Sequence, residues 1–343
     1  MNMARCERIE RSYTPFSEHR RRREAFVFLS HCRCFTGLFS FSENQLQEKL
    51  QNWLSAPDPS TNHNIARKAH HKGTASWFFQ GGIFKQWKSS PSLLWIHGKR
   101  TSLSLFTVRH PTDYHICSGF RQKCLVVCFS CYCCLRPLRL SPSSGIIQDI
   151  SSQCEAGSGF MAYFYCDFRD DDKQNCRNLV LSIISQLCVQ SNLCCDMLSR
   201  IYLAHNKGAQ KPSDETLIKC LTEMVSLPIQ GPIYLIMDAL DECPNDSGLP
   251  TAREEVLDLI NDLVGLRLPN LHICVTSRPE IDIKTTLEPL TTLRISLHNQ
   301  TGQKEDIVDY VGSVVNSDKK MRRWREEDRK LVIDTLSERA DGM

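Results

Sequence analysis

Five short stretches of the chain are rich in apolar residues, the one at 233–237 continuously so, and segments with helical spacing of apolar residues lie between them. Continuously apolar runs of this length are typical of parallel strands buried on both faces. The five predicted strands are 92–97, 161–168, 233–237, 271–276 and 293–297. Helical spacing occurs over 178–187, 217–227 and 254–266, with the end of a further helix at 145–150. Strands that alternate with helices in this way predict an α/β fold with a doubly wound parallel sheet.

The strand at 233–237 ends abruptly in acidic residues. Asp238 follows it directly, and Asp241 and Glu242 lie on the next turn. Since ligands of parallel sheets bind at the carboxyl ends of strands, Asp238 is expected at a crevice. In phosphoryl-transfer enzymes such an acid holds magnesium and a following acid orients the attacking water, which is the Walker B arrangement. The alternative is a strand followed by a solvated acidic turn.

The flanks of this core have a different pattern. Residues 1–42 show no sustained period and are expected to be disordered, whereas 43–54 predict a helix that ends before Pro57. The polar stretch 58–73 predicts a linker, in which His63, His70 and His71 are solvated loop residues rather than metal ligands. Residues 75–87 predict two short helical pieces around Gly81 and Gly82, and helices are expected again at 304–315 and 326–340.

The strand at 92–97 runs into Gly98 and Lys99, the place where a phosphate-binding loop is expected. Such a loop requires G-x-x-x-x-G-K-[ST]. Counted from Gly98, the closing positions hold Leu103, Ser104 and Leu105. We find this motif, the Walker A, nowhere in the sequence, so Gly98 and Lys99 are at most its remnant.

Composition adds three limits. The 343 residues carry a net charge of only +3, which argues against a nucleic-acid partner, and 41% hydrophobic content suffices for a large core. No apolar run approaches the roughly 20 residues of a membrane span. Acids interrupt the N-terminal region, and no signal peptide or presequence pattern is present, so a cytoplasmic protein without a membrane partner is expected.

Cysteine is unusually abundant, with 18 residues in the chain. Six of them crowd one short segment: Cys117, Cys124, Cys128, Cys131, Cys133 and Cys134. Cys128-x-x-Cys131 and Cys131-x-x-Cys134 could form half of a zinc site, but the pairs overlap and lack a partner pair. We therefore interpret residues 100–142 as a Cys-rich insertion.

Six stretches together carry a family resemblance: 55–87, 93–99 (LLWIHGK), 161–179, 231–244 (with DALDE), 268–283 (with TSRPE) and 336–343. On these residues the chain resembles the fungal NACHT-type STAND NTPases, also described by their nephrocystin-like N-terminal domain. The resemblance implies a P-loop NTPase core at 91–298, a helical and linker segment at 43–90, and the start of a helical domain at 299–343. It also implies Mg and ATP or GTP as cofactors, and a nucleotide-driven, self-oligomerising signalling switch of the NLR-like type.

The resemblance assigns roles to matching residues. Asp238 would hold magnesium, Asp241 and Glu242 would position water, and Arg278 would contact the terminal phosphate directly or through its neighbours. Structural alternatives remain: a strand cap for Asp238, solvated turn acids, and an ion pair between Arg278 and these acids.

The chain also departs from the family. There LLWIHGK continues into a phosphate loop of the type PGSGKS and a helix ending in SSIIQDI, whereas here residues 100–142 intervene before Ser143 resumes the pattern. An unspliced intron or an altered gene model would produce such a replacement, and the chain also stops before the family's later helices, winged helix and repeats. Three hypotheses follow: the NTPase core of a STAND switch that works by nucleotide exchange, impaired in this chain because the Walker A is lost; a catalytically inactive α/β protein-interaction module; and, most remotely, a Cys-based metal-binding segment.

Overall fold

The computed structural model describes residues 36–69, 75–98, 107–108, 125–126, 142–155, 157–228, 231–246, 248–297, 301–319 and 321–339. The chain divides into two compact units, Met1–Asn52 and Trp53–Met343. Helix α2 (Thr36–Leu54) supplies the described part of the first unit.

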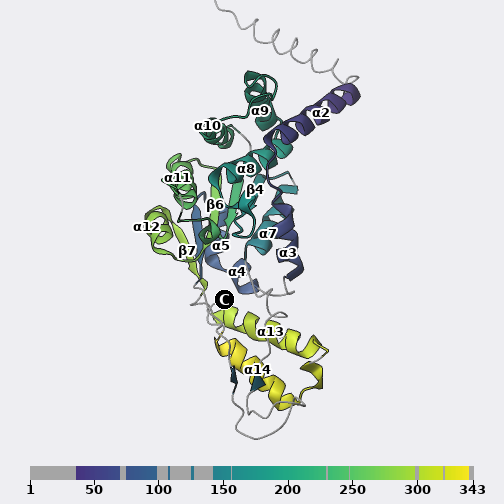
Figure 1. The fold of residues 1–343 in the computed structure, drawn as a ribbon, viewed down its shortest axis with the longest axis vertical. Helices are drawn as coiled ribbons and strands as arrows, with labels where there is room; N and C mark the ends of the chain where they lie inside the picture. Colours follow the sequence, from purple (N-terminus) through teal and green to yellow (C-terminus); the bar gives the residue numbers. More distant parts are fainter. Residues whose placement is uncertain are drawn as a thin grey trace, which may run out of the picture. The chain divides into compact units, whose positions relative to one another are not determined.

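The second unit is built on a parallel sheet of five strands in the order β4-β5-β6-β1-β7 (Figure 1). The strands are β1 (Leu93–His97), β4 (Phe160–Tyr165), β5 (Ile233–Asp238), β6 (Leu271–Ser277) and β7 (Leu293–Ser296). Every residue of β5 and β6 is buried, as their unbroken apolar runs predict. After β1 the chain forms the edge strand β4, and β5 and β6 then occupy the positions between β4 and β1. The last strand, β7, pairs with the other side of β1.

One face of the sheet is covered by α4 (Ser76–Gln80), α5 (Gly82–Ser89) and α7 (Pro142–Glu155). Aromatic side chains of α4 and α5 and isoleucines of α7 meet the strands in one cluster: Phe78, Phe84, Trp87, Ile146, Ile147, Ile150, Leu94, Ile96, Tyr234, Ile236 and Ile295. The Trp87 indole donates a 3.1 Å hydrogen bond to the carbonyl of Ile273, and His272 Nδ1 lies 2.8 Å from the Trp87 carbonyl. These bonds satisfy the polar atoms that the aromatic layer buries.

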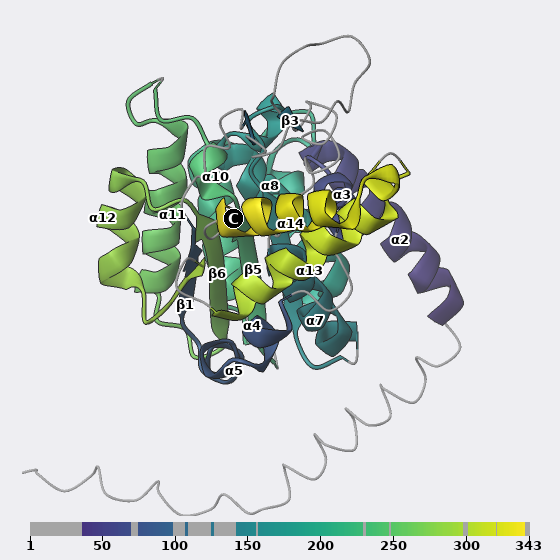
Figure 2. The same ribbon diagram turned by 90° about the horizontal axis from the view of Figure 1, so that it is seen from below.

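Helices α8 (Cys176–Gln190), α11 (Ala252–Gly265) and α12 (Ile281–Leu290) form a second layer, since α11 packs against both neighbours and α8 packs on β4 (Figure 2). Two more helices, α9 (Asn192–Ala204) and α10 (Asp214–Val225), pack on α8. The α11 helix begins at a capping box in which Thr251 and Glu254 satisfy each other's backbone N–H groups. Helices on both faces of a parallel sheet confirm the predicted α/β fold.

The exposed edge of β4 is closed by two glutamines of α8. Gln186 accepts from the Tyr163 N–H at 3.0 Å and donates to the Tyr163 carbonyl at 2.8 Å. Gln190 repeats the arrangement one helical turn later with Met161, at 3.0 and 2.6 Å. Because unpaired edge groups invite pairing with other chains, the two amides act as a substitute for a sixth strand.

The remaining helices follow the sheet. Helix α13 (Thr301–Ser317) and helix α14 (Glu326–Arg339) pack together, with a short 3₁₀ turn η5 (Met321–Arg323) between them and a small apolar core of their own. Asp306 of α13 accepts from the Ala75 N–H at 2.5 Å and from the Trp77 indole at 3.0 Å. The predicted helices at 304–315 and 326–340 are therefore confirmed.

Two predictions about the fold need correction, and two helices were missed. Helix α2 begins at Thr36 rather than at residue 43, and helices α9 and α12 were not predicted. The expected linker at 58–73 contains helix α3 (Ser60–Ala69). Asp58 starts α3 by accepting from the Ser60 N–H at 2.8 Å and from its hydroxyl at 2.8 Å, a cap that the low apolar content of the segment conceals.

Most of the Cys-rich insertion and the N-terminal 35 residues lie outside the described residues, as do His70, His71 and Lys99. Within the insertion the structure describes two strands of two residues each, β2 (Thr107–Val108) and β3 (Leu125–Val126), which pair antiparallel. The disorder predicted for 1–42 stays a prediction over residues 1–35, and the remote alternative of zinc binding by the insertion stays untested.

Candidate functional site

The carboxyl ends of β1, β5 and β6 bring the predicted site residues to one edge of the sheet. His97 pairs with Ser277, and Gly98 extends this ladder by donating to the Ser277 carbonyl at 3.4 Å. Arg278 is the next residue along, and Asp238 ends the neighbouring strand β5. Residues separated by up to 180 positions in the sequence therefore meet because parallel strands end on the same side.

Asp238 is 6% exposed, and hydroxyl groups from two other elements donate to its carboxylate. Ser143, in the first turn of α7, donates to Oδ1, and Thr276 of β6 donates to the same oxygen at 2.5 Å. Thr276 Oγ1 in turn accepts from the Ala239 N–H at 2.9 Å. Ala239 has a left-handed backbone, with φ 57°, so the turn after Asp238 is held in a conformation that costs a non-glycine residue about 1–2 kcal/mol.

The donors around Asp238 match the chemistry of magnesium. Mg²⁺ prefers oxygen ligands, and in P-loop NTPases a serine or threonine hydroxyl and a strand-end aspartate supply the protein's share. Ser143 and Asp238 are residues of these two types, and here the Ser143 hydroxyl is hydrogen-bonded to the Asp238 carboxylate. The described residues, those at this edge included, contain no group of three or more His, Cys, Asp or Glu side chains arranged to hold a metal ion.

Asp241 and Glu242 sit side by side in the 3₁₀ turn η3 (Leu240–Glu242), but their side chains face opposite neighbours. Asp241 turns toward β6, where Oδ1 accepts from the Arg278 N–H at 2.9 Å and Oδ2 lies 3.2 Å from Arg278 Nε. Glu242 turns toward β4, where it accepts from the Phe168 N–H at 3.3 Å. The two acids that the sequence groups together therefore contact different loops.

Arg253 of α11 joins the loops that carry these residues, and the sequence did not indicate it. Its buried guanidinium donates to the carbonyls of Asp241 at 2.7 Å and Cys243 at 3.0 Å. It also pairs with Glu280 at 2.5 Å and Asp282 at 3.2 Å, in the segment after Arg278. A single arginine in a charged helix turn looks like a solvated residue, so only the fold reveals this contact.

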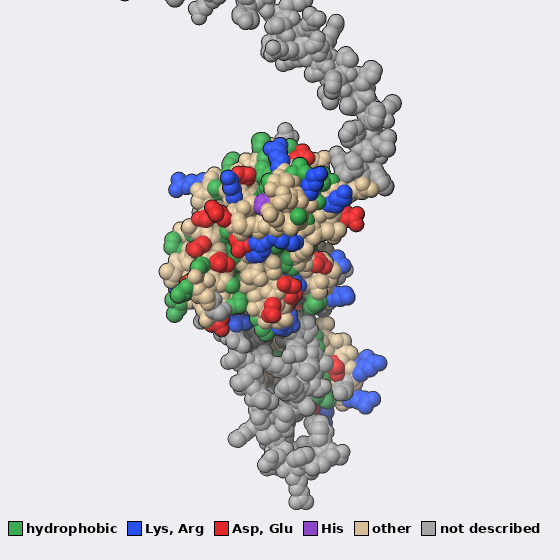
Figure 3. All heavy atoms as spheres, turned by 45° about the horizontal axis from the view of Figure 1, so that its top comes forward, with side chains coloured by type: hydrophobic (Ala, Val, Ile, Leu, Met, Phe, Trp, Pro, Cys, Tyr) green, Lys and Arg blue, Asp and Glu red, His purple; other side chains and the backbone are tan. Residues whose placement is uncertain are grey.

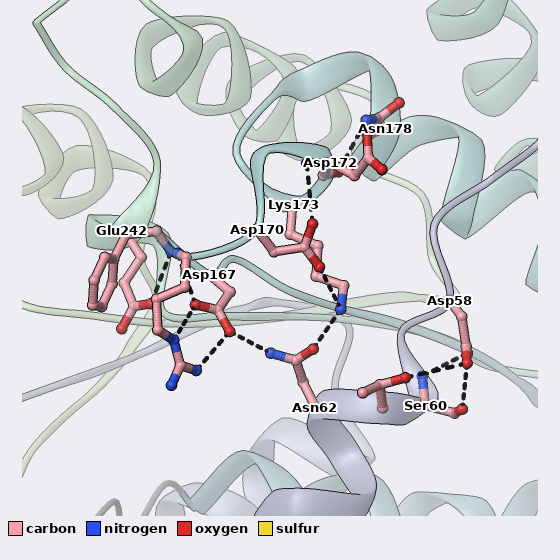
Figure 4. A network of polar contacts seen from close by, with 12 residues as sticks. Asp58, Ser60, Asn62, Asp167, Asp170, Asp172, Lys173, Asn178 and Glu242 are labelled. Carbon is pink, nitrogen blue, oxygen red and sulfur yellow. Dashed lines mark hydrogen bonds and ion pairs between the residues drawn. The ribbon is translucent and has the colours of Figure 1, made fainter.

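A second polar network lies at the end of β4 (Figure 4). Asp167 forms a two-pronged ion pair with Arg169, at 2.8 and 2.7 Å, and accepts from Asn62 of α3 at 2.9 Å. Asn62 also accepts from the buried Lys173 at 2.6 Å, and Lys173 lies 3.1 Å from Asp170. The hydrogen bonds from Arg169 lower the pKa of Asp167 to about 2, so Asp167 is charged at neutral pH.

His63 attaches α3 to the same strand. Its Nδ1 lies 3.2 Å from the Tyr165 hydroxyl, and its ring packs 5.4 Å from that of Tyr163. Burial, and then the charge of Arg67, lower the pKa of His63, which favours the neutral ring. The expectation of a solvated loop histidine is therefore wrong for His63.

Comparison with known proteins adds one finding. Residues 142–278 match the family model described as Nephrocystin 3, N-terminal. The match covers less than half of the chain, and it begins where α7 begins and ends at Arg278, so it contains Asp238, Asp241 and Glu242 but not β1 or Gly98. A comparison with curated proteins gave no significant match. The matched segment is thus similar to a nephrocystin-type, NACHT-like domain, in agreement with the parallel α/β fold.

One face of the molecule shows how charged side chains are distributed on it. On the face drawn in Figure 3, acidic and basic side chains are interspersed, consistent with the net charge of +3. Among the described residues no helix is both long and apolar enough to span a bilayer.

Proposed function

We propose that residues 91–298 are the NTPase core of a STAND-type, NLR-like signalling switch whose nucleotide site is impaired in this chain. The observation that carries the proposal is the pairing of Ser143 with Asp238 beside the Asp241–Arg278 pair, at the carboxyl edge of the sheet. A hydroxyl at a helix start and an aspartate at a strand end are the protein ligands of nucleotide-bound magnesium in P-loop NTPases. The match of residues 142–278 to a nephrocystin-type model supports the same class.

In this proposal each group has one task. Asp238 and Ser143 would hold Mg²⁺, which would neutralise charge on the phosphates of ATP or GTP. Asp241 or Glu242 would orient water. Arg278 would contact a terminal phosphate through its other guanidinium N–H groups, because the ion pair with Asp241 engages Nε and the side chain is 36% exposed.

The impairment follows from the sequence after β1. The segment between Gly98 and α7 contains no G-x-x-x-x-G-K-[ST], so the loop amides and the lysine that grip the β- and γ-phosphates are missing. Each such charge-assisted contact contributes about 1.5–3 kcal/mol. Losing two of them weakens binding by about two to four orders of magnitude, since 1.4 kcal/mol is tenfold.

Calorimetry of the full chain with magnesium–ATP and magnesium–GTP tests the impairment. We expect a Kd no tighter than about millimolar, which corresponds to about −4 kcal/mol. Micromolar binding that Asp238→Ala abolishes would show a working site and overturn the impairment.

A loop graft tests the class of the protein separately. Residues 100–141 are replaced by a short segment that completes a G-x-x-x-x-G-K-[ST] loop between β1 and α7, and a matched graft carries alanine in place of its lysine. If the edge is an NTPase site, the first graft should bind magnesium–ATP at least about a hundredfold more tightly than the second. Equal, weak binding by both folded grafts would contradict the NTPase assignment.

A catalytically inactive α/β protein-interaction module is the second candidate. It is favoured by the hydrogen bonding at the carboxyl edge of the sheet, because the carboxylates of Asp238 and Asp241 already accept hydrogen bonds from protein groups. Self-association or protein partners would then act through surfaces other than this crevice, in a cytoplasmic protein. A Cys-based metal-binding segment within residues 100–142 is a remote third candidate, and zinc analysis at 1:1 stoichiometry, lost on Cys128→Ser, would support it.

A further inference from the structure

The thiols of Cys166 and Cys243 are in contact, one just after β4 and the other just after η3. Cys166 follows β4 and Cys243 follows the turn η3, and the Cys243 thiol donates to Cys166 Sγ with the two sulfurs 3.3 Å apart. Both residues are 2% exposed. They are 77 positions apart in the sequence, and neither spacing nor motif indicated that they would meet.

The backbone holds both cysteines in place from several sides. The Cys166 N–H donates to the Asp238 carbonyl at 2.9 Å, which continues the β4–β5 ladder by one residue. The Cys243 N–H donates to the Leu240 carbonyl at 3.2 Å, and Arg253 Nε donates to the Cys243 carbonyl at 3.0 Å. The two thiols are therefore fixed at close range, and a bond between them requires a sulfur shift of about 1.3 Å to reach the usual 2.0 Å.

We propose that Cys166 and Cys243 are an oxidative modification site, at which a hydroperoxide converts the two thiols to an intramolecular disulfide. This inference goes beyond the proposed function and does not depend on nucleotide binding. One cysteine, as its thiolate, attacks the peroxide oxygen; it becomes a sulfenic acid and water or an alcohol leaves. The second thiolate then displaces hydroxide from that sulfur, so two thiols and one peroxide give one disulfide, with two electrons passing to the peroxide.

The pair geometry favours the disulfide over further oxidation. A sulfenic acid next to a fixed thiol condenses with it, whereas an isolated one persists or is oxidised again. Burial limits access, and the hydrogen bond shared with Cys243, followed by burial, holds the pKa of the Cys166 thiol well above its ordinary value. The first step is therefore slow and needs a small oxidant or a transient opening of the edge.

The neighbouring thiols are placed differently. Cys176 is buried nearby, but its Sγ lies 3.6 Å from the Glu255 carbonyl, to which it donates. Cys274 of β6 is fully buried and has no thiol contact among the described residues, which makes it an internal control. A disulfide at Cys166 and Cys243 would tie the loop that carries Asp167 to the turn that carries Glu242.

Peptide mapping of the full chain tests the proposal. The folded protein is treated with hydrogen peroxide, quenched, alkylated under denaturing conditions and digested without reduction. We expect a linked peptide containing Cys166 and Cys243, two hydrogens lighter than the sum of its parts, at least about tenfold more abundant than any link to Cys274. Equal alkylation of Cys166, Cys243 and Cys274 after treatment, or a dominant link of Cys166 or Cys243 to another cysteine, would overturn the proposal.

Single variants give a second measurement. In Cys243→Ser, peroxide should leave Cys166 as a sulfenic acid that dimedone traps, and Cys166→Ser should do the same for Cys243. Dimedone labelling of wild type should be at least about tenfold lower, because the partner thiol consumes the sulfenic acid. Equal labelling of wild type and variants would contradict the pairing, and if a variant fails to fold, the wild-type peptide map decides alone.

Discussion

The Arg278 guanidinium lies against the Asp241 carboxylate, with Nε 3.2 Å from Oδ2, while the backbone N–H of the same arginine donates to Oδ1 at 2.9 Å. One residue after β6 thus holds the turn after β5 through both its backbone and its side chain. The Asp241 side chain is 7% exposed and that of Arg278 is 36% exposed. The aspartate is therefore the structural half of the pair, and the arginine is the half that solvent, or a ligand, can reach.

Substitution of the two partners should have unequal effects. Arg278→Ala should lower the free energy of unfolding by only about 0–1 kcal/mol, because the ion pair is partly exposed and its backbone bond remains. Asp241→Ala should cost about 1–3 kcal/mol, because it leaves a partly buried N–H without its acceptor. Urea unfolding of both variants and the double variant measures the coupling. An Arg278 effect as large as that of Asp241 would contradict this division.

Arg253 should be the most sensitive of these positions. Arg253→Met removes donors to the carbonyls of Asp241 and Cys243, and we expect a loss of about 2–4 kcal/mol because the first bond is partly buried and the second fully buried. Arg294→Met is the matched control, since among the described residues Arg294 pairs with Glu288 and the two side chains are 49% and 41% exposed. The control should cost about 0–1 kcal/mol. Equal free energies of unfolding for the two variants would show that the Arg253 contacts contribute nothing to stability.

The sheet was largely predictable from the sequence because buried parallel strands are continuously apolar. All five predicted strands are present, although the apolar run at 161–168 extends beyond β4, which ends at Tyr165. The strand order was not predictable. Nothing local in the sequence says that β1 lies between β6 and β7, since that order depends on crossovers between distant segments.

The candidate site was predictable only in part. Asp238, Asp241 and Arg278 stand out because polar residues follow apolar strands, and the fold does place the last two in contact. The side chains of Asp241 and Glu242 point in opposite directions because of the backbone geometry of η3. This geometry could not be predicted from the residue types alone. Asn62 and His63 were missed because α3 has few apolar residues and is held by polar contacts to β4.

The glutamine pair on α8 should protect the edge of β4. Gln186→Ala together with Gln190→Ala leaves two backbone N–H and two carbonyl groups of the strand without partners, so we expect a loss of about 2–4 kcal/mol in unfolding free energy. The variant should also aggregate faster, because an open strand edge is a template for pairing. Gln148→Ala, at an exposed position of α7, is the control. Urea unfolding and light scattering test both effects, and unchanged values in the double variant would refute the capping role.

The stability of the protein should depend on Asp167 in mild acid. Its pKa in the folded protein is lowered from 3.8 to about 2, chiefly by the hydrogen bonds from Arg169. A folded pKa below the unfolded one means that the charged carboxylate stabilises the fold above about pH 4, and that this contribution disappears as the pH falls toward 2. Asp167→Asn should therefore lower the unfolding free energy at pH 5 more than at pH 3. Asp246→Asn, which removes an exposed acid, is the control. Urea unfolding at the two pH values gives the comparison, and an Asp167→Asn effect that is the same at both would mean that the Arg169 pair does not hold the carboxylate in its charged form.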